Sequence, residues 1–281
     1  MKKSTIGKYI TALLLVLVIS LGLCACTAQH GDTDTTAALT TAQDATQPAA
    51  ADETLTITDG NKTIFYSAEL ESTQSSYPVI AWANGTSCAT ESYTALLTEL
   101  AKGGYIVVAD ASMMTADGKE QIDSIDYIID QNSNASGSFY NKVDTNAIGV
   151  CGHSQGGRSC INAAQADDRI RCVVSIAGAS SAEEADGLTT PCLFLTGTND
   201  MVVVSSQWCK PSYDAVAGRA AYASLEDAVH TACMTNPKKI ADYTLCWFDA
   251  YLKEDDEAKA VFEDDGRLAN DGYWKDFENK N

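Results

Sequence analysis

Six short apolar segments, each five to seven residues long, constrain the fold of this chain more than any other feature. They are Pro78–Ala83, Tyr105–Ala109, Ala147–Cys151, Arg171–Ala177, Cys192–Thr196 and Ala220–Ser224. Between them lie segments of helical spacing, such as the one marked by Leu96, Leu97 and Leu100 and ended by Gly103-Gly104. Continuous apolar runs of this length are typical of strands that helices cover on both faces. The pattern therefore predicts an α/β fold, with a mostly parallel sheet between two layers of helices.

Further elements are predicted around these strands. An opening hairpin is expected from Leu55–Thr58 and Thr63–Ser67, with its turn at Asp59-Gly60-Asn61. Helical spacing marks a second helix, a third helix after Ser154, and a long final helix. The apolar face of the second helix carries Ile122, Ile125 and Ile129, and that of the final helix carries Ile240, Tyr243, Trp247 and Tyr251.

The N-terminus has the features of an export signal. Lysines at positions 2, 3 and 8 precede an apolar run from Ile10 to Leu23, which is typical of a signal peptide. The run ends in Leu23-Cys24-Ala25-Cys26, which resembles the bacterial lipobox and indicates lipidation of Cys26. Cys24 fits this role less well, because the bulky Leu23 would then stand where a small residue is expected. An ordinary signal peptide is the alternative, and a membrane span is less favoured because the run is shorter than ~20 residues.

The segment Thr27–Asp52 is nearly all polar or small, and Leu39 is its only large aliphatic residue. Such a segment buries too little apolar surface to offset the entropy of ordering it, so we expect a flexible tether. The chain is thereby divided into a signal peptide over residues 1–25, a lipidated cysteine and tether over 26–52, and a folded domain over 53–281. The predicted location is the outer face of a bacterial cell membrane, with the lipid anchor as the only membrane contact.

The chain carries a formal net charge of -19. A strongly acidic surface repels the phosphate backbone of nucleic acids and anionic lipid headgroups. Nucleic-acid binding and direct electrostatic binding to membranes are therefore excluded as functions.

The most specific motif is Gly152-His153-Ser154-Gln155-Gly156, a G-x-S-x-G sequence directly after a predicted strand and before a predicted helix. A turn this sharp needs small residues two positions before and after its centre, and it presents the central hydroxyl above the carboxyl edge of the sheet. Ser154 is therefore predicted to be a nucleophile. A tight glycine turn with an incidental serine is the alternative.

A serine nucleophile needs an adjacent base, which is usually histidine. The chain has three histidines. His30 lies in the tether, and His153 lies in the turn itself, where it is expected to point away from Ser154. His230 remains, in a polar loop between the last predicted strand and the final helix, and is predicted to be the base.

The base in turn needs a carboxylate that fixes its tautomer. Asp200 follows the apolar strand Cys192–Thr196, so it should lie at the same edge of the sheet as Ser154. It also falls between Ser154 and His230, the chain order typical of such enzymes. Glu226 and Asp227 are rival candidates, although they lie on the loop of His230 itself.

Acyl transfer also requires donors for the developing oxyanion. The backbone N–H of Gln155, at the start of the third helix, is one candidate. The second is the backbone N–H of Thr86, because the turn at Asn84-Gly85 allows the chain to approach the site closely. A plain strand-ending turn is the alternative for this segment.

Over residues 53–281 the chain resembles the α/β-hydrolase superfamily. Within it, the chain is similar to the group of dienelactone hydrolases, cutinase-like polyester hydrolases and chlorophyllases. The matching motifs are Asn84-Gly85-Thr86, Gly152–Gly157, Thr198-Asn199-Asp200, the loop of His230 and the helix Tyr243–Leu252. Two departures weigh against polyester cleavage, though not against ester hydrolysis. No aromatic residue occurs in Ile176–Ser181, where polyester hydrolases carry one, and Gln155 stands where they usually have methionine.

These residues predict a carboxylic ester hydrolase that acts through an acyl-enzyme, without a metal or an organic cofactor. Two alternatives stay open. The same triad could cleave a peptide or thioester bond, or the chain could be a binding lipoprotein on a hydrolase fold. The connection Ala179–Thr190 is too short for a large cap domain, so we expect an open site for short acyl chains or the exposed ends of larger esters.

The chain has 10 cysteines. Cys151, Cys172 and Cys192 lie in apolar runs and are expected to be small buried residues. A disulfide between Cys209 and Cys233 would tie the loop of Asp200 to that of His230. Cys88 and Cys246 are competing partners, and all four thiols could be free.

Overall fold

The computed structural model describes residues 53–280. The predicted signal peptide over residues 1–25, the lipidation of Cys26 and the tether up to residue 52 lie outside the described residues and remain predictions. Within the described part of the chain, no helix combines the length and the apolar character needed to cross a membrane.

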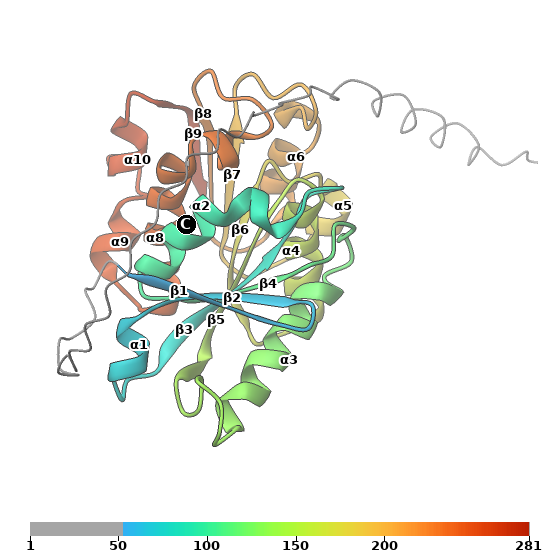
Figure 1. The fold of residues 1–281 in the computed structure, drawn as a ribbon. Coiled ribbons are helices and arrows are strands. Elements are labelled where there is room, and N and C mark those ends of the chain that lie inside the picture. The colour runs from blue at the N-terminus through green and yellow to red at the C-terminus, as the bar shows by residue number, and fades with distance from the viewer. Residues whose placement is uncertain (1–52, 281) are drawn as a thin grey trace, which may run out of the picture. The chain divides into compact units, whose positions relative to one another are not determined.

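The described chain forms one nine-stranded sheet, in the order β1-β2-β4-β3-β5-β6-β7-β8-β9 (Figure 1). The strands are β1 (Thr54–Asp59), β2 (Lys62–Ser67), β3 (Tyr77–Ala83), β4 (Ile106–Asp110), β5 (Val143–His153), β6 (Ile170–Ile176), β7 (Cys192–Gly197), β8 (Ala220–Leu225) and β9 (Trp274–Lys280). Strands β4, β3, β5, β6, β7 and β8 pair in parallel, and β1, β2 and β9 are antiparallel. The six parallel strands correspond to the six apolar segments, so the predicted α/β-hydrolase type of sheet is confirmed.

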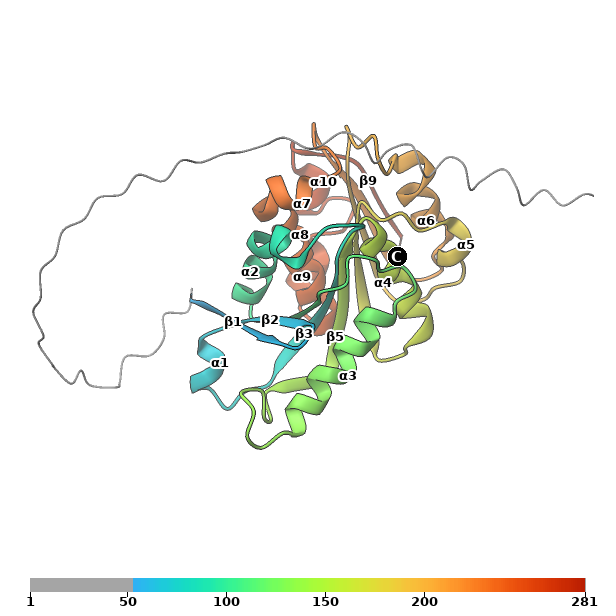
Figure 2. The ribbon, with the colours of Figure 1, turned by 45° about the vertical axis from the view of Figure 1, so that its right-hand side comes forward.

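Helices cover both faces of the sheet, as Figure 2 shows from the side. One layer contains α2 (Thr94–Lys102), α7 (Ala232–Thr235), α8 (Pro237–Leu252), α9 (Asp256–Ala260) and α10 (Arg267–Asn270). The other contains α3 (Lys119–Ser133), α4 (Gln155–Ala166), α5 (Ala182–Ala185) and α6 (Cys209–Ala215). The single turns α1 (Glu69–Ser72), η2 (Thr90–Tyr93) and η3 (Ser205–Gln207) complete the set.

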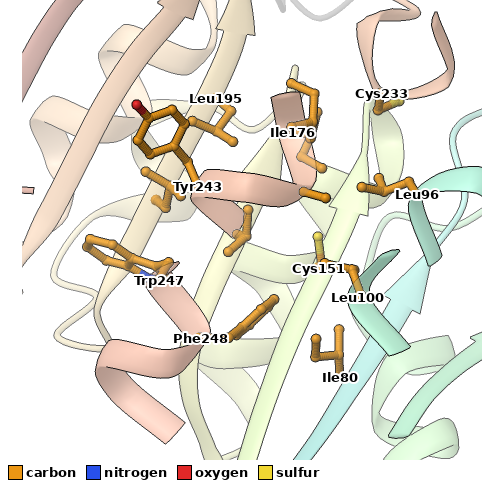
Figure 3. Packing of buried hydrophobic residues seen from close by; sticks show 14 of the residues in the cluster. Ile80, Leu96, Leu100, Cys151, Ile176, Leu195, Cys233, Tyr243, Trp247 and Phe248 are labelled. Carbon is orange, nitrogen blue, oxygen red and sulfur yellow. The ribbon is translucent and has the colours of Figure 1, made fainter. Parts of the chain in front are cut away.

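The sheet separates two hydrophobic clusters. Successive residues of β3 point to opposite faces, so Ile80 and Trp82 pack in one cluster while Val79 and Ala81 pack in the other. This two-sided burial explains why the buried parts of the central strands are almost continuously apolar. In the first cluster, Leu96 and Leu100 of α2 lie on the same face of the sheet as Trp247 and Phe248 of α8, with Cys151 of β5 between them (Figure 3).

The predicted helical faces are largely those observed. Ile240, Tyr243 and Trp247 are buried, whereas Tyr251 is only half-buried and Phe248 is fully buried in its place. The prediction that this helix is the final one is wrong. After α8 the chain forms α9 and α10 and then β9, which pairs antiparallel with β8.

The strand β9 escaped prediction because its sequence is mostly charged and polar. It is an edge strand, with Trp274 buried and Phe277 packed against the first cluster, while the intervening side chains face water. Charged residues on an edge strand also oppose pairing with other chains.

A buried ion pair joins the hairpin to the sheet. The Nζ atom of Lys62 lies 2.6 Å from the carboxylate of Asp110, both side chains are 6% exposed, and Lys62 also donates to the hydroxyl of Ser124. The substitution Lys62→Met is expected to lower the free energy of unfolding by about 3–5 kcal/mol, because it leaves the Asp110 charge buried without its partner.

Urea denaturation measures this effect, and Lys102→Met is the matched control. Lys102 pairs with Glu99 on an exposed face, so its loss should cost no more than about 1 kcal/mol. Equal costs for the two variants would show that the Lys62–Asp110 pair contributes no more than a surface pair.

Candidate active site

Ser154 lies at the sharp turn between β5 and α4. Its backbone has φ 58 and ψ -118, a conformation that L-residues rarely adopt. A side chain on Gly156 would come within 2.1 Å of the carbonyl oxygen of Ala83, and one on Gly152 within 2.4 Å of that of Gly156. Gly156 is therefore required by the close approach of α4 to β3, and Gly152 by the close approach of α4 to its own strand β5.

The strand register brings three more loops to this turn. Ala83 of β3 pairs with Gly152 of β5, so Gly85 and Thr86 emerge beside the Ser154 turn. Further along the sheet, Gly197 of β7 pairs with Leu225 of β8. The loops that carry Asp200 and His230 therefore leave the sheet at neighbouring positions on the same edge.

These loops place Ser154, His230 and Asp200 in one hydrogen-bonded row. The Oγ atom of Ser154 is 2.9 Å from Nε2 of His230, and Nδ1 of His230 is 2.8 Å from Oδ2 of Asp200. Because a carboxylate can only accept, Nδ1 of His230 carries the proton. The unprotonated Nε2 is then free to accept the proton of the serine hydroxyl.

Asp200 is held rigidly behind His230. Its side chain has no exposed surface, and its Oδ1 atom accepts the backbone N–H groups of Val202 and Val203, each at 2.9 Å. Burial alone would raise the pKa of Asp200, but the hydrogen bonds from His230 and these amides outweigh it and hold the pKa below its usual value. The carboxylate is therefore ionised at neutral pH.

The rival carboxylates face other groups. The side chain of Asp227 is exposed and lies 3.5 Å from the amide of Asn199, and that of Glu226 lies 3.4 Å from Nζ of Lys275. Neither has a hydrogen bond to His230 within residues 53–280. Asp200 is therefore the carboxylate that the structure brings to the histidine.

His153 points away from Ser154, as expected, and is 2% exposed. Its Nδ1 atom is 3.0 Å from the hydroxyl of Tyr93, and its Nε2 atom is 2.8 Å from the carbonyl oxygen of His230. Burial, followed by the nearby His230, lowers the pKa of His153 to about 4. The ring is thus neutral in the folded state throughout the range in which a free histidine titrates.

The residues that carry the candidate oxyanion donors, Thr86 and Gln155, are in contact. The hydroxyl of Thr86 donates to Oε1 of Gln155 at 3.2 Å, which connects the two residues. The N–H of Thr86 has no acceptor among the described residues, and that of Gln155 belongs to the first turn of α4, where no intrahelical acceptor exists. Both amides are available to a negatively charged oxygen.

The loop of Thr86 is fixed by Asn84, whose role the sequence analysis missed. Asn84 is fully buried, and the two N–H bonds of its Nδ2 group are shared among three acceptors within 3.1 Å: the backbone carbonyls of Asp110 and Ser112 and Thr90 Oγ1. Its Oδ1 atom accepts from Trp82 Nε1 at 2.8 Å. Every polar atom of the side chain is thereby satisfied, so this loop is anchored at its first residue.

The surroundings of Ser154 are open and partly apolar. Several exposed apolar side chains lie in loops at this edge of the sheet: Met113, Met114, Met201, Val202 and Val229. The connection between β6 and β7 contains only the single-turn helix α5, capped by Ser181 and Glu184. No cap domain is inserted there, as predicted.

Neither metal binding nor a disulfide is indicated near the site. Between residues 53 and 280 there is no group of three or more side chains arranged to bind a metal ion. The eight cysteines in this range are free. The suggested disulfide between Cys209 and Cys233 is wrong, because the two thiols lie in different hydrophobic clusters on opposite faces of the sheet.

The sequence of this chain is similar to a family of known proteins and to several individual proteins. The family described as PET hydrolase-like matches residues 25–267 of the chain. Cutinase est1 of Thermobifida alba is 25% identical over 203 residues, which are 70% of this chain and 66% of that protein. The bis(hydroxyethyl) terephthalate hydrolase of Streptomyces coelicolor is 22% identical over 70% of this chain and 63% of its own length. The matched region thus spans slightly less than two thirds of these relatives.

Proposed function

Because this chain belongs to the PET hydrolase-like family of α/β-hydrolases, we propose that it hydrolyses carboxylic esters with Ser154 as the nucleophile. The observation that carries this proposal is the hydrogen-bonded row from Ser154 through His230 to Asp200. Its members come from three separate loops, and a structural role alone would not require a serine, a histidine and a carboxylate in this order.

The proposed reaction has two steps. Ser154 Oγ attacks the ester carbonyl while its proton moves to Nε2 of His230, and the resulting imidazolium is stabilised by Asp200. His230 then returns this proton to the departing alcohol, which leaves an acyl-serine. In the second step a water molecule gives a proton to His230 as it attacks the acyl group, and His230 returns that proton to Ser154 Oγ as the acid is released.

The developing oxyanion is assigned to the amides of Thr86 and Gln155. Both N–H groups are free to donate, and the N-terminus of α4 adds a positive end of a helix dipole. We infer that Thr86 Oγ1, through its bond to Gln155, helps to keep the two donors at a fixed separation.

The open site supports small or protruding substrates. Without a cap over Ser154, little apolar surface is available to bury a long acyl chain, and each buried CH₂ would contribute only ~0.8 kcal/mol. We therefore propose short acyl chains or the exposed ends of larger esters as substrates. The names of the relatives, cutinases and a bis(hydroxyethyl) terephthalate hydrolase, agree with an ester substrate.

A fluorophosphonate probe tests the proposal directly. One equivalent is expected to bind to Ser154, and the same protein should hydrolyse p-nitrophenyl acetate. Ser154→Ala should abolish labelling, whereas Ser206→Ala, an exposed serine on η3, should leave it unchanged.

Each alternative gives a different result. A binding protein on this fold would fail to react with the probe. A peptidase or thioesterase would react with the probe but would turn over esters poorly compared with peptides or thioesters. Either result would contradict the proposed ester hydrolysis.

A further inference from the structure

A second hydrogen-bonded row runs behind the nucleophile and joins the loop of Thr86 to the loop of His230. The N–H of Gly85 donates to the hydroxyl of Tyr93 at 3.0 Å, and this hydroxyl is 3.0 Å from Nδ1 of His153. Nε2 of His153 is in turn 2.8 Å from the backbone carbonyl of His230. The row thus begins next to a candidate oxyanion donor and ends on the backbone of the proposed base.

The chemistry at its two ends fixes the direction of every bond. The Gly85 amide can only donate, so the oxygen of Tyr93 accepts there. The carbonyl of His230 can only accept, so Nε2 of His153 must carry the proton. In the neutral ring Nδ1 is then unprotonated and accepts the hydroxyl proton of Tyr93, so the row has no alternative arrangement while the ring stays neutral.

Burial keeps this row intact. Tyr93 is fully buried and His153 nearly so, which leaves little room for competing water. A Cβ atom on Gly85 would lie 3.0 Å from both His153 Nδ1 and Tyr93 Oη, so any side chain at this position would crowd the row. The pKa of His153, about 4, keeps the ring neutral at the pH values where the proposed base would work.

We propose that Tyr93 and His153 are positioning residues that hold the loop of Thr86 and the loop of His230 at a fixed separation. This inference rests on the proposed ester hydrolysis, because the two loops must act on the same carbonyl group. The base must meet the proton of Ser154 while Thr86 and Gln155 meet the oxygen. Misplacement of a reacting group by about 1 Å can cost about 100-fold in rate.

Tyr93→Phe tests the proposal by removing one hydroxyl from the row. We expect kcat for p-nitrophenyl acetate to fall about 10-fold with KM changed less than about twofold, because oxyanion stabilisation acts on the transition state. The matched control is Tyr105→Phe, which removes the hydroxyl of another buried tyrosine that bonds to Asp249, away from the site. Equal kcat values for Tyr93→Phe and the wild type, or equal losses in both variants, would overturn the proposal.

His153 allows a rescue experiment. His153→Phe removes both hydrogen bonds of the ring, whereas His153→Gln retains one donor for His230 and one acceptor for Tyr93. We expect His153→Gln to recover at least several-fold of the kcat lost in His153→Phe. If His153→Phe does not fold, the comparison of His153→Gln with the wild type still tests the row, because a loss above about 100-fold would contradict it.

Two readouts are independent of activity. In ¹⁵N NMR of the full chain at pH 7, the ring signals of His153 are identified as those that disappear in His153→Gln. In the wild type these signals should show a protonated Nε2 and an unprotonated Nδ1. The opposite tautomer or an imidazolium would refute the row.

Acid stability gives the second readout. An unfolded histidine binds a proton near pH 6.5, whereas folded His153 does so only near pH 4, so this residue makes the fold less stable as pH falls between those values. His153→Gln should remove that part of the acid sensitivity, and unchanged acid sensitivity would count against the row.

These readouts separate failure of the inference from failure of the proposed function. A wild-type protein with the predicted tautomer but without ester turnover would leave the row in place and contradict ester hydrolysis. A wild-type protein that hydrolyses esters, with Tyr93→Phe unaffected, would contradict only the positioning role.

Discussion

The substitution Ser154→Ala is expected to reduce kcat for p-nitrophenyl acetate by roughly 10⁴- to 10⁶-fold. Without the Oγ atom no acyl-enzyme forms, and the rate that remains comes from the oxyanion donors acting on water. His230→Ala should cause a loss of similar size, because the serine hydroxyl 2.9 Å from Nε2 then has no base. The double variant should be no slower than either single variant, since the residues act as one unit.

Steady-state kinetics with active-site titration measures these losses. Ser206→Ala should retain the wild-type rate, because Ser206 is exposed on η3 and outside the hydrogen-bonded row. Losses that add up in the double variant would mean that Ser154 and His230 act separately. A Ser154→Ala variant with more than about a tenth of the wild-type activity would require another nucleophile.

Asp200→Asn is expected to lower kcat by about 10⁴-fold while the fold is retained. The carbonyl oxygen of the new amide can still accept the N–H groups of Val202 and Val203, as Oδ1 of Asp200 does now. Its NH₂ group then faces Nδ1 of His230, where the carboxylate oxygen lies at 2.8 Å. Since NH₂ only donates, Nδ1 loses its proton to Nε2, and Nε2 can no longer accept the proton of Ser154.

The control for this prediction is Asp227→Asn. Asp227 lies on the loop of His230 but its side chain faces Asn199, so this variant should keep the wild-type kcat. Circular dichroism would establish that both variants are folded. If Asp200→Asn were nearly as active as the wild type and Asp227→Asn inactive, the carboxylate would have been assigned to the wrong loop.

The sheet could be predicted because each of its central strands has a recognisable pattern within its own short segment of sequence. Each central strand is buried on both faces, so an apolar run such as Cys192–Thr196 can be recognised as a strand without knowing which strands lie beside it. The turn at Ser154 is equally recognisable, because the close approach of α4 to β5 and β3 requires glycine two residues before and after the serine. The edge strand β9 could not be predicted in this way, since only Trp274 and Phe277 of its side chains pack against the core.

Contacts between distant segments were harder to predict. The suggested pairing of Cys209 with Cys233 followed from their positions after Asp200 and His230 in the sequence. The sheet keeps them apart, because α6 and α7 cover opposite faces and each thiol packs into the cluster of its own face. Nearness of two loops at one edge of a sheet does not determine on which side of the sheet the following helices lie.

By itself, the sequence determined the α/β architecture and indicated the sharp turn at Ser154 and His230 as the candidate base, because periodicity, turn geometry and chemical type are properties of short segments. Only the tertiary structure decided which carboxylate faces His230, and only it joined Gly85, Tyr93, His153 and the His230 backbone in one row. The physical reason is that a hydrogen bond requires two atoms within about 3 Å of each other. That separation is set by strand register and helix packing across the whole sheet, which no single segment of the sequence contains.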